Sequence, residues 1–427
     1  MTRFLLKLGL SFCGHDESRS SSNRDHSLSP SQIRGQGYDG ASNMQGHLNG
    51  LKTLILNETP SAYCIHCFVH QLQLTLVVAL AKKDSNVDEF FCLVTNVLNI
   101  VGTSFKRRNL LRKHQAEQLE ELLISGEVHT GRRSNQERGL QRPGDTRWGS
   151  HYRTLDNIIF LFPSVIHVLE FTGCECPNYT DRLLDKTLVD MIKKFEFAFI
   201  LHLVWKVLMM TNELSSSLQM MDQDIVNAMG FLAFTKQRLQ NMRDNESESL
   251  MDDVSSFCDK HDIVIMEMDA SYFPGKSKRK ALDVTYSHHL RLEIFYVVIN
   301  LHLQELSNHF DVVSTDLLLV MASLNPVNSF GSFDKGKMMR LTEYYMNEFD
   351  SNKLRDLIFQ LDSFIVYARG SDKRFFNLKG ISDLAKVLVK SDLHQTGPLV
   401  YLLIKLTLIL SVAIVSVERA FSSMKYI

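Results

Sequence analysis

The sequence predicts a mixed α/β and all-α fold: a short α/β piece, a long all-helical middle and an apolar C-terminal piece. Between residues 33 and 85 the local patterns alternate strand, helix, strand, helix, which is typical of an α/β layer. Over residues 87–123 and 181–245 apolar side chains recur at helical spacing and proline is scarce. A continuous apolar run over residues 398–417 follows near the end of the chain.

Each element of the α/β piece has its own signal. Residues 14–36 are Ser-rich and polar without either period, which predicts a linker. "GQGYD" (35–39) is predicted to be a short extended piece, and apolar residues spaced along 41–58 predict one face of a helix. "AYCIHCFV" (62–69) is rich in β-formers and predicts a buried strand, after which residues 70–83 predict a helix.

Composition limits the class of protein. A chain of 427 residues predicts two or three domains, or one domain with a large insertion. Its 44% apolar and 22% charged residues are ordinary for a globular protein, and its net charge of −1 gives no overall attraction to nucleic acid or membrane. The seven cysteines are sparse and odd in number, which favours a reducing compartment. The N-terminal apolar run is interrupted by Lys7, so it reads as a helix rather than a signal peptide.

The apolar run Pro398–Val417 is long enough to span a bilayer. Lys405 lies near its middle, however, and no basic flank orients it. A buried helix leading into a buried strand is therefore the favoured interpretation, and a membrane span is the alternative.

The first candidate site residue is Asp39, which lies between glycines at the end of the first predicted strand. A carboxylate at a strand end is a common metal ligand in α/β enzymes. An ordinary Asp in a turn is the commoner explanation of such a stretch on its own.

A second cluster contains Cys64, His66, Cys67 and His70. Thiolates and imidazoles at this spacing could bind zinc. Cys64 and Cys67 would point to opposite faces of a strand, and no second ligand pair follows at finger spacing. Packing or substrate-positioning roles for Cys67 and His70, at a strand-to-helix turn, are the preferred interpretation.

A third motif, "GDTRWGSHYRTLDNI", pairs Arg147 with Trp148. An exposed Trp can stack on an unpaired base while the guanidinium contacts phosphate, whereas a core Trp anchoring a helix start is equally compatible with the motif. Other basic residues gather nearby, with acids interleaved that indicate a partly solvated helix face. The basic residues are Lys106, Arg107, Arg108, Arg112, Lys113, Arg132, Arg133, Arg138, Arg142 and Arg153.

The fourth motif, "SVERAFSSMKYI", brings one carboxylate, Glu418, out of the apolar run. It could pair with Arg419, or it could be a second metal ligand if the fold places it near Asp39. Two-metal phosphoryl transfer needs several such carboxylates to converge.

These motifs occur in the order found in hAT-superfamily transposases. "GQGYDGASNM", "HCFVHQLQL", "DTRWGSHYRTL" and "SVERAFSSMK" resemble plant TTF- or MYM-type zinc-finger proteins with a DUF4371 region and a hAT C-terminal dimerisation region. The resemblance covers nearly the whole chain from Ile33 onward. It implies an incomplete RNase H-like α/β core interrupted by a large all-helical insertion.

The resemblance also implies roles for single residues. Asp39 matches the second catalytic aspartate of the family and Glu418 its final glutamate, both ligands of Mg²⁺ in the ancestral enzyme. Cys67 and His70 match a Cys-x-x-His element beside the active site. The implied domains are a remnant helix and linker (1–32), a partial RNase H-like segment (33–85), a helical insertion (86–395) and a truncated dimerisation segment (396–427).

In the same way, Arg147 and Trp148 match an Arg-Trp pair whose Trp stacks at the DNA end. The apolar run resembles the dimerisation segment, which implies self-association and argues against a membrane span.

The departures from the family matter as much as the matches. The family has a first catalytic aspartate on a strand well before "GQGYDGASNM", and here Asp16 and Asp25 lie instead in the polar linker. The N-terminal zinc finger is absent from this sequence, which stops at Ile427. We therefore expect an inactive, nuclear, transposase-derived protein that binds DNA and itself, with no resident cofactor, membrane or small-molecule substrate. An active Mg²⁺-dependent transposase and a non-functional fragment of a decayed element are the alternatives; Mg²⁺ would need a third acid beside Asp39 and Glu418.

Overall fold

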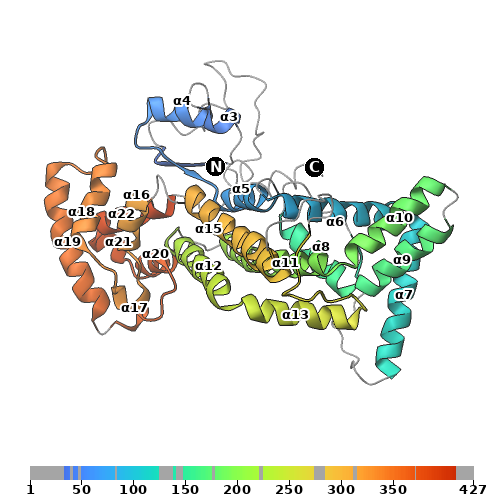
Figure 1. Ribbon diagram of the computed structural model, residues 1–427. Coiled ribbons are helices and arrows are strands. Elements are labelled where there is room, and N and C mark those ends of the chain that lie inside the picture. Colours follow the sequence, from blue (N-terminus) through green and yellow to red (C-terminus); the bar gives the residue numbers. More distant parts are fainter. Residues whose placement is uncertain are drawn as a thin grey trace, which may run out of the picture. The chain divides into compact units, whose positions relative to one another are not determined.

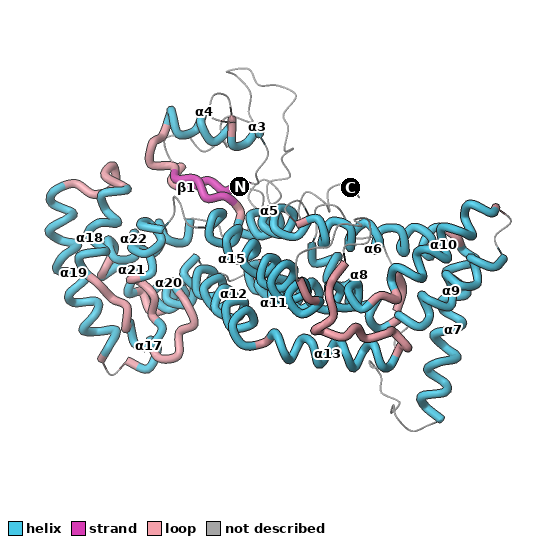
Figure 2. Tube along the Cα trace, viewed as in Figure 1, coloured by secondary structure: helices cyan, strands magenta, loops and turns pink. Residues whose placement is uncertain are grey.

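The structure is a computed structural model that describes most of the chain. The described residues are 33–38, 42–46, 50–81, 84–124, 138–140, 148–175, 178–220, 225–273, 284–310, 315–370 and 372–409. Within these ranges the chain is mostly helical and contains one two-stranded sheet (Figure 2). The predicted helical middle is confirmed, and the α/β part consists of two strands with their neighbouring helices.

The elements follow one another as labelled in Figure 1. In the N-terminal half they are β1 (Gly35–Tyr38), α3 (Ser42–Gln45), α4 (Leu51–Glu58), β2 (Tyr63–His66), α5 (Phe68–Ala81), α6 (Ser85–Thr103), α7 (Phe105–Ile124), α8 (Trp148–Phe160), α9 (Phe162–Glu175), α10 (Tyr179–Ile192) and α11 (Phe195–Leu218). In the C-terminal half they are α12 (Ile225–Asn245), α13 (Ser247–Lys260), α14 (Tyr286–His288), the π-helix η2 (His289–Phe295), α15 (Tyr296–Phe310), α16 (Thr315–Ala322), α17 (Val327–Phe330), α18 (Lys335–Tyr344), α19 (Ser351–Arg369), the 3₁₀-helix η3 (Lys373–Phe375), α20 (Ile381–Lys390), α21 (Leu393–Thr396) and α22 (Pro398–Ile409).

The two predicted strands are confirmed and pair in parallel. Gly35 lies opposite Tyr63 and Tyr38 opposite His66, so both strands end at the same edge. The single helix predicted over 41–58 is instead two helices, α3 and α4. The amide of Gly50 donates to the carbonyl of Gly46 at 3.0 Å, and Gly50 starts α4 as its N-cap, so the chain turns between the two glycines.

The chain divides into two compact units. The first comprises Met1–Gln71, Ser216–Ala233 and His309–Ile427, and the second comprises Leu72–Ser215 and Phe234–Asn308. The sheet therefore belongs to the first unit, and helices α6 to α10 belong to the second. The domain boundaries at residues 33, 86 and 396 stay predictions.

In the second unit, α11 supplies much of the core. Leu201, Leu203 and Val204 on this helix are fully buried. By length and composition α11 is the one described helix able to cross a membrane, and the bent pair α8 and α9 passes the same test together. Of the apolar window in α11, 72% is buried inside the protein, as is typical of a core helix.

The first described part of the C-terminal apolar run is a helix, α22, in the first unit. Val400, Leu403 and Ile404 are buried, and α22 packs against α19 and α20. Lys405 stays exposed, with its ammonium 5.3 Å from the centre of the Tyr401 ring. The helical prediction is thus confirmed up to Ile409, and the predicted strand after it lies outside the described residues.

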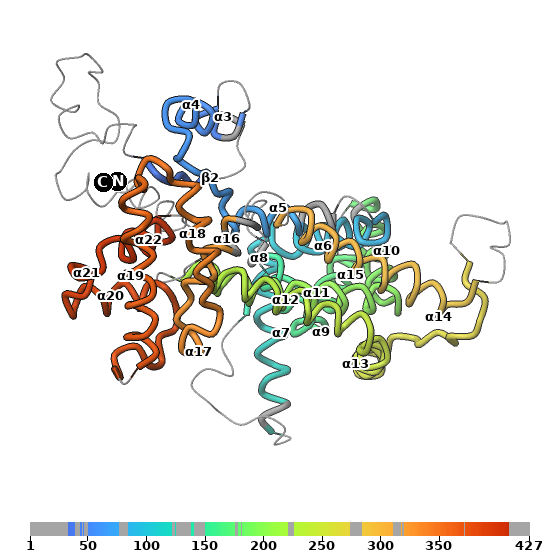
Figure 3. The backbone as a smooth tube through the Cα atoms, turned by 90° about the vertical axis from the view of Figure 1, so that its left-hand side faces the viewer, coloured from blue at the N-terminus to red at the C-terminus, as the bar shows by residue number. Residues whose placement is uncertain are grey.

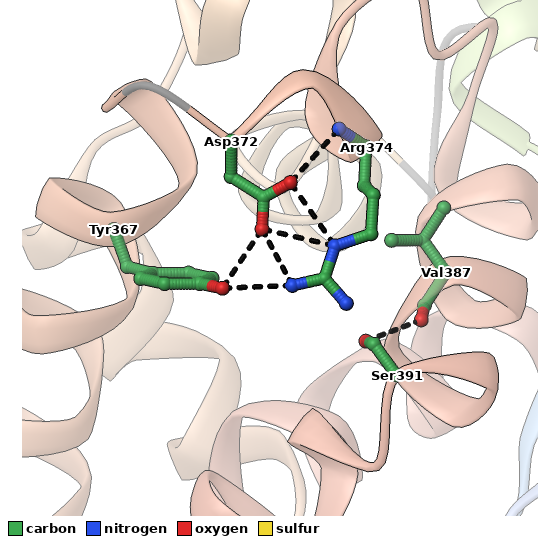
Figure 4. A network of polar contacts seen from close by, with 5 residues as sticks. All are labelled: Tyr367, Asp372, Arg374, Val387 and Ser391. Atoms are coloured by element: carbon green, nitrogen blue, oxygen red, sulfur yellow. Dashed lines mark hydrogen bonds and ion pairs between the residues drawn. The ribbon is translucent and has the colours of Figure 1, made fainter.

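A polar network fixes the connection between α19 and α20 in the first unit (Figure 4). The hydroxyl of Tyr367 donates to Asp372 at 2.8 Å, and the guanidinium of Arg374 donates to the same carboxylate at 2.6 Å. The hydrogen bonds from Arg374 hold the pKa of Asp372 well below its usual range. Further along, the Ser391 hydroxyl donates to the Val387 carbonyl at 2.7 Å where α20 ends.

Candidate functional site

The carboxyl edge of the β1–β2 sheet is the place where the sequence predicts a site. The amide of Cys67, the first residue after β2, donates to the carbonyl of Tyr38, the last residue of β1, at 2.9 Å. The ends of both strands are therefore locked side by side. Ligands of α/β proteins bind at this edge of a parallel sheet, because the chain leaves each strand there with its loops free to carry functional groups.

Cys67 and His70 lie at the strand-to-helix turn where the sequence predicts them. The side chain of Cys67 is buried, with 2% exposed, between β2 and α5. His70 is half-buried in the first turn of α5, and its ring centre is 5.4 Å from that of His66. The structure thus gathers two imidazoles and a buried thiol at the edge, whereas their role beside an active site stays a prediction.

Cys64 and its neighbours are arranged for packing. Burial raises the pKa of the Cys64 thiol, although the charge of Lys52 lowers it. Burial likewise raises the pKa of Tyr38, to which Cys64 adds. A zinc ligand must be a thiolate, and among the described residues no three His, Cys, Asp or Glu side chains are placed to hold a metal ion.

The sheet is anchored by residues that the sequence analysis did not connect with it. The hydroxyl of Tyr63 donates to the carbonyl of Tyr344 at 2.9 Å, and its ring meets that of Tyr345 edge-on at 5.4 Å. Arg34 donates from Nε to Glu348 at 2.7 Å. Partners about 280 residues apart in the chain leave no local sequence signal, since each pair is created only by the fold.

The other predicted site residues fall largely outside the described ranges. Asp39 follows Tyr38 directly in sequence, but it, Arg147 and Glu418 are not among the described residues. Trp148 begins α8, and only its backbone is described. The predicted carboxylate pair and the Arg-Trp pair therefore keep their status as predictions.

Helix α8 itself is held by an aspartate shared between two partners in the second unit. The indole nitrogen of Trp205, the second tryptophan, donates to Asp156 at 3.2 Å. Arg138 donates to the same carboxylate at 2.9 Å, and its guanidinium lies 4.3 Å from the centre of the Phe160 ring. This arrangement fixes the end of α8 opposite to the one where Trp148 lies.

A basic groove lies between α7 and α9 in the second unit. It has a volume of about 710 Å³, and its lining includes the cationic side chains of Lys106, Arg112 and Lys113 and the ring of Phe171. The ammonium of Lys106 lies 5.3 Å from the Phe171 ring centre and 3.8 Å from Glu175. A groove of mixed cationic and aromatic lining is suited to an anionic ligand with flat or apolar groups.

The charges of α7 are placed in the order that destabilises an isolated helix. No acid lies in its first turn and no base in its last, while Lys106, Arg107 and Arg108 are near its N-terminus and Glu120 and Glu121 near its C-terminus. A helix dipole favours the opposite order, by roughly 0.3–1 kcal/mol for each charge near an end. Helix stability therefore does not account for this pattern.

The cations of the groove are only weakly paired. Lys113 lies 3.6 Å from Glu117, with 75% and 55% of the two side chains exposed, and the Lys106–Glu175 pair is similarly exposed. Exposed pairs of this kind contribute about 0–1 kcal/mol, so an anionic ligand could displace them at little cost. The groove is thus electrostatically available to a partner.

Comparison with known proteins places one segment. Residues 24–50 match the family described as DUF4371: ZMYM1/FAM200, RNase-like domain. No solved structure matches the chain. The matched segment contains β1, α3 and the predicted catalytic residue Asp39. The match supports a transposase-derived domain in this part of the chain.

Proposed function

We propose that this protein is a transposase-derived nuclear protein that binds DNA through the basic groove of α7 and α9 and no longer cleaves it. The observation that carries the proposal is the charge order of α7, whose cations cluster where the helix dipole disfavours them. Such a cluster is retained at a cost in helix stability, and binding of phosphates would compensate for that cost. The match of residues 24–50 supports the transposase origin.

The groove presents cations at a spacing that suits a nucleic-acid backbone. Lys106 and Lys113 are seven residues apart on one helix, a rise of roughly 10 Å, and Arg112 lies between them in sequence. Contacts of lysine and arginine with phosphates supply most of the non-specific affinity of proteins for DNA. Phe171 adds an aromatic surface at the same groove.

The loss of cleavage is proposed from the sequence. The resemblance assigns only Asp39 and Glu418 to the metal site, and Asp16 and Asp25 lie in the Ser-rich stretch. Two divalent cations held by two carboxylates would lack both charge and geometry. We further propose self-association through residues 396–427, whose described part, α22, is an apolar helix.

The experiment is a salt titration of DNA binding by the full chain. Replacing Lys106, Arg112 and Lys113 by Ala should weaken binding and should reduce the salt slope by about 0.9 for each phosphate that is no longer neutralised. A control triple variant, Lys353→Ala, Lys386→Ala and Lys390→Ala, removes the same charge from the first unit and should leave the slope unchanged. Equal effects of the two triple variants would overturn the assignment of the groove.

The proposed loss of cleavage has a separate test. The full chain should not nick a transposon-end hairpin in the presence of Mg²⁺. Nicking that requires Mg²⁺ and is abolished by Asp39→Ala would establish the active transposase instead. Light scattering with and without DNA tests the remaining alternative, since a monomeric chain indifferent to DNA would be a non-functional fragment.

A further inference from the structure

His289, at the start of the π-helix η2 in the second unit, is buried between two carboxylates. Its Nδ1 lies 2.6 Å from Oε2 of Glu293, and its Nε2 lies 3.1 Å from Oε1 of Glu196 on α11. Only 4% of the imidazole is exposed. An ionised carboxylate only accepts hydrogen bonds, so both ring nitrogens must donate, and the ring is an imidazolium.

A separate segment of chain covers the imidazolium. The ring of Tyr272 stacks on that of His289, with centres 3.7 Å apart and planes 11° from parallel. Tyr272 is held by a short two-stranded arrangement, in which its amide donates to the Val284 carbonyl at 2.7 Å and the Tyr286 amide donates to Ala270 at 3.1 Å. The course of α14 into η2 and α15 beneath this segment can be followed in Figure 3.

The charged and titratable groups around the ring come from five elements or segments. Glu196 (α11), Glu293 (η2), Tyr272, Tyr286 (α14) and Glu89 (α6) all act on it or on the tyrosine that covers it. Burial raises the pKa of Tyr272 to about 12, with the carboxylates adding to this effect, so the phenol stays neutral. Near Glu196, Glu89 and Lys194 line a cavity of about 90 Å³.

We propose that His289 is a proton-dependent clasp, which as an imidazolium joins α11 to η2 and holds the Tyr272 segment, and which opens when it loses its proton. A neutral ring has one donor and one acceptor, so one carboxylate would then face a nitrogen lone pair in a buried site. That arrangement leaves Glu196 or Glu293 without its hydrogen bond, and separation of the elements relieves it. The rare π-turn at this point is of a kind that often marks functional sites.

The direction of the pH response follows from the carboxylates. Burial lowers the pKa of His289, but the hydrogen bonds and charges of Glu196 and Glu293 outweigh it and raise the pKa above its ordinary 6.5. The folded chain thus binds this proton more tightly than the unfolded chain. The stabilisation is complete below pH 6.5 and is lost as the pH rises through the folded-state pKa.

The experiment follows amide hydrogen exchange of residues 268–273 and 284–289 in the full chain over a pH series, corrected for intrinsic exchange. Once the pH exceeds the folded-state pKa, opening should increase tenfold per pH unit, since one proton is released. Glu293→Gln retains the shape of the side chain and accommodates a neutral ring, so it should flatten this dependence. Glu248→Gln, which removes an exposed acid that pairs with Arg291 of the same π-helix, is the matched control.

Nuclear magnetic resonance of the His289 ring gives a readout that does not depend on any variant folding. The ring of the wild-type chain should stay an imidazolium at a pH where exposed histidines are neutral. A His289 that titrates at or below 6.5, or a Glu293→Gln chain that opens with the wild-type pH dependence, would overturn the proposal.

Discussion

Replacing His302 by Leu should stabilise the second unit at neutral pH. His302 lies in α15 with none of its surface exposed, and neither ring nitrogen has a hydrogen-bond partner among the described residues. A buried polar group left unpaired costs about 1–3 kcal/mol. Leu has no polar atoms, although its different shape returns up to about 1.5 kcal/mol. The expected net gain in the free energy of unfolding is about 1–2 kcal/mol.

The same substitution should remove part of the acid sensitivity. Burial lowers the pKa of His302 from 6.5 to about 4. The unfolded chain therefore binds this proton more tightly, so the stability is complete above pH 6.5 and declines as the pH falls toward 4. At about 1.4 kcal/mol per pH unit, the decline from this residue amounts to about 3 kcal/mol by pH 4. His302→Leu should lack that share of the decline.

The assay is urea unfolding at pH 7 and pH 5, followed by tryptophan fluorescence, because Trp205 lies in the same unit. His394→Leu is the control, since the Nδ1 of that half-buried ring is placed 3.4 Å from the Leu388 carbonyl and the residue belongs to the first unit. A His302→Leu chain that is less stable than wild type at pH 7, or equally acid-sensitive, would refute the reasoning. Either result would mean that the ring is hydrated or paired in solution.

Three further substitutions test local features of the fold. Arg369→Ala should loosen the left-handed turn at Phe330 (φ 59°), because its guanidinium donates to the Phe330 carbonyl at 2.7 Å; we expect a loss of about 1–2 kcal/mol, seen as faster amide exchange of that turn. Gly50→Ala should cost about 1–3 kcal/mol, since a Cβ there would lie 2.4 Å from the backbone nitrogen of Gly46, and Gly50→Ser should cost no less; a neutral thermal shift would contradict this. Asp84→Ala should cost about 1 kcal/mol by removing the N-cap of α6, whereas Asp84→Asn should retain most of it in urea unfolding.

The sequence predicted the local structure wherever periodicity was strong. Runs of β-formers predicted the strands that become β1 and β2, and helical spacing predicted the all-helical middle. The break between α3 and α4 was missed because glycines within an apolar pattern do not by themselves end a helix. Leu292, included in a wide apolar face, is 45% exposed, since it lies two residues from the buried Leu290 and Ile294 and so points away from them.

The long-range contacts could not be predicted in the same way. Glu196 and His289 are 93 residues apart, and each reads in sequence as an ordinary member of an amphipathic helix. Only packing of α11 against η2 turns them into a buried ion pair. The basic cluster of α7 was visible in the sequence, but the groove and its Phe171 depend on α9, which packs beside α7.

The two buried histidines of the second unit should together limit its stability from opposite sides. His289 is held charged by two carboxylates, so its contribution disappears as the pH rises, whereas His302 is held neutral, so its contribution disappears as the pH falls. Both lie on the continuous run from η2 into α15, and they are 13 residues apart in sequence. Amide exchange of this unit should therefore be slowest at an intermediate pH.

Each limb of that profile should respond to one substitution alone. Glu293→Gln should flatten the alkaline limb and leave the acid limb, and His302→Leu should do the reverse, because neither substituted side chain contacts the other histidine in the described contacts. Distant sites of this kind are normally additive within about 0.5 kcal/mol. If one substitution flattened both limbs, the two protonation events would be coupled through the helix, and the clasp would then control the whole run from η2 to α15 rather than the Tyr272 segment only.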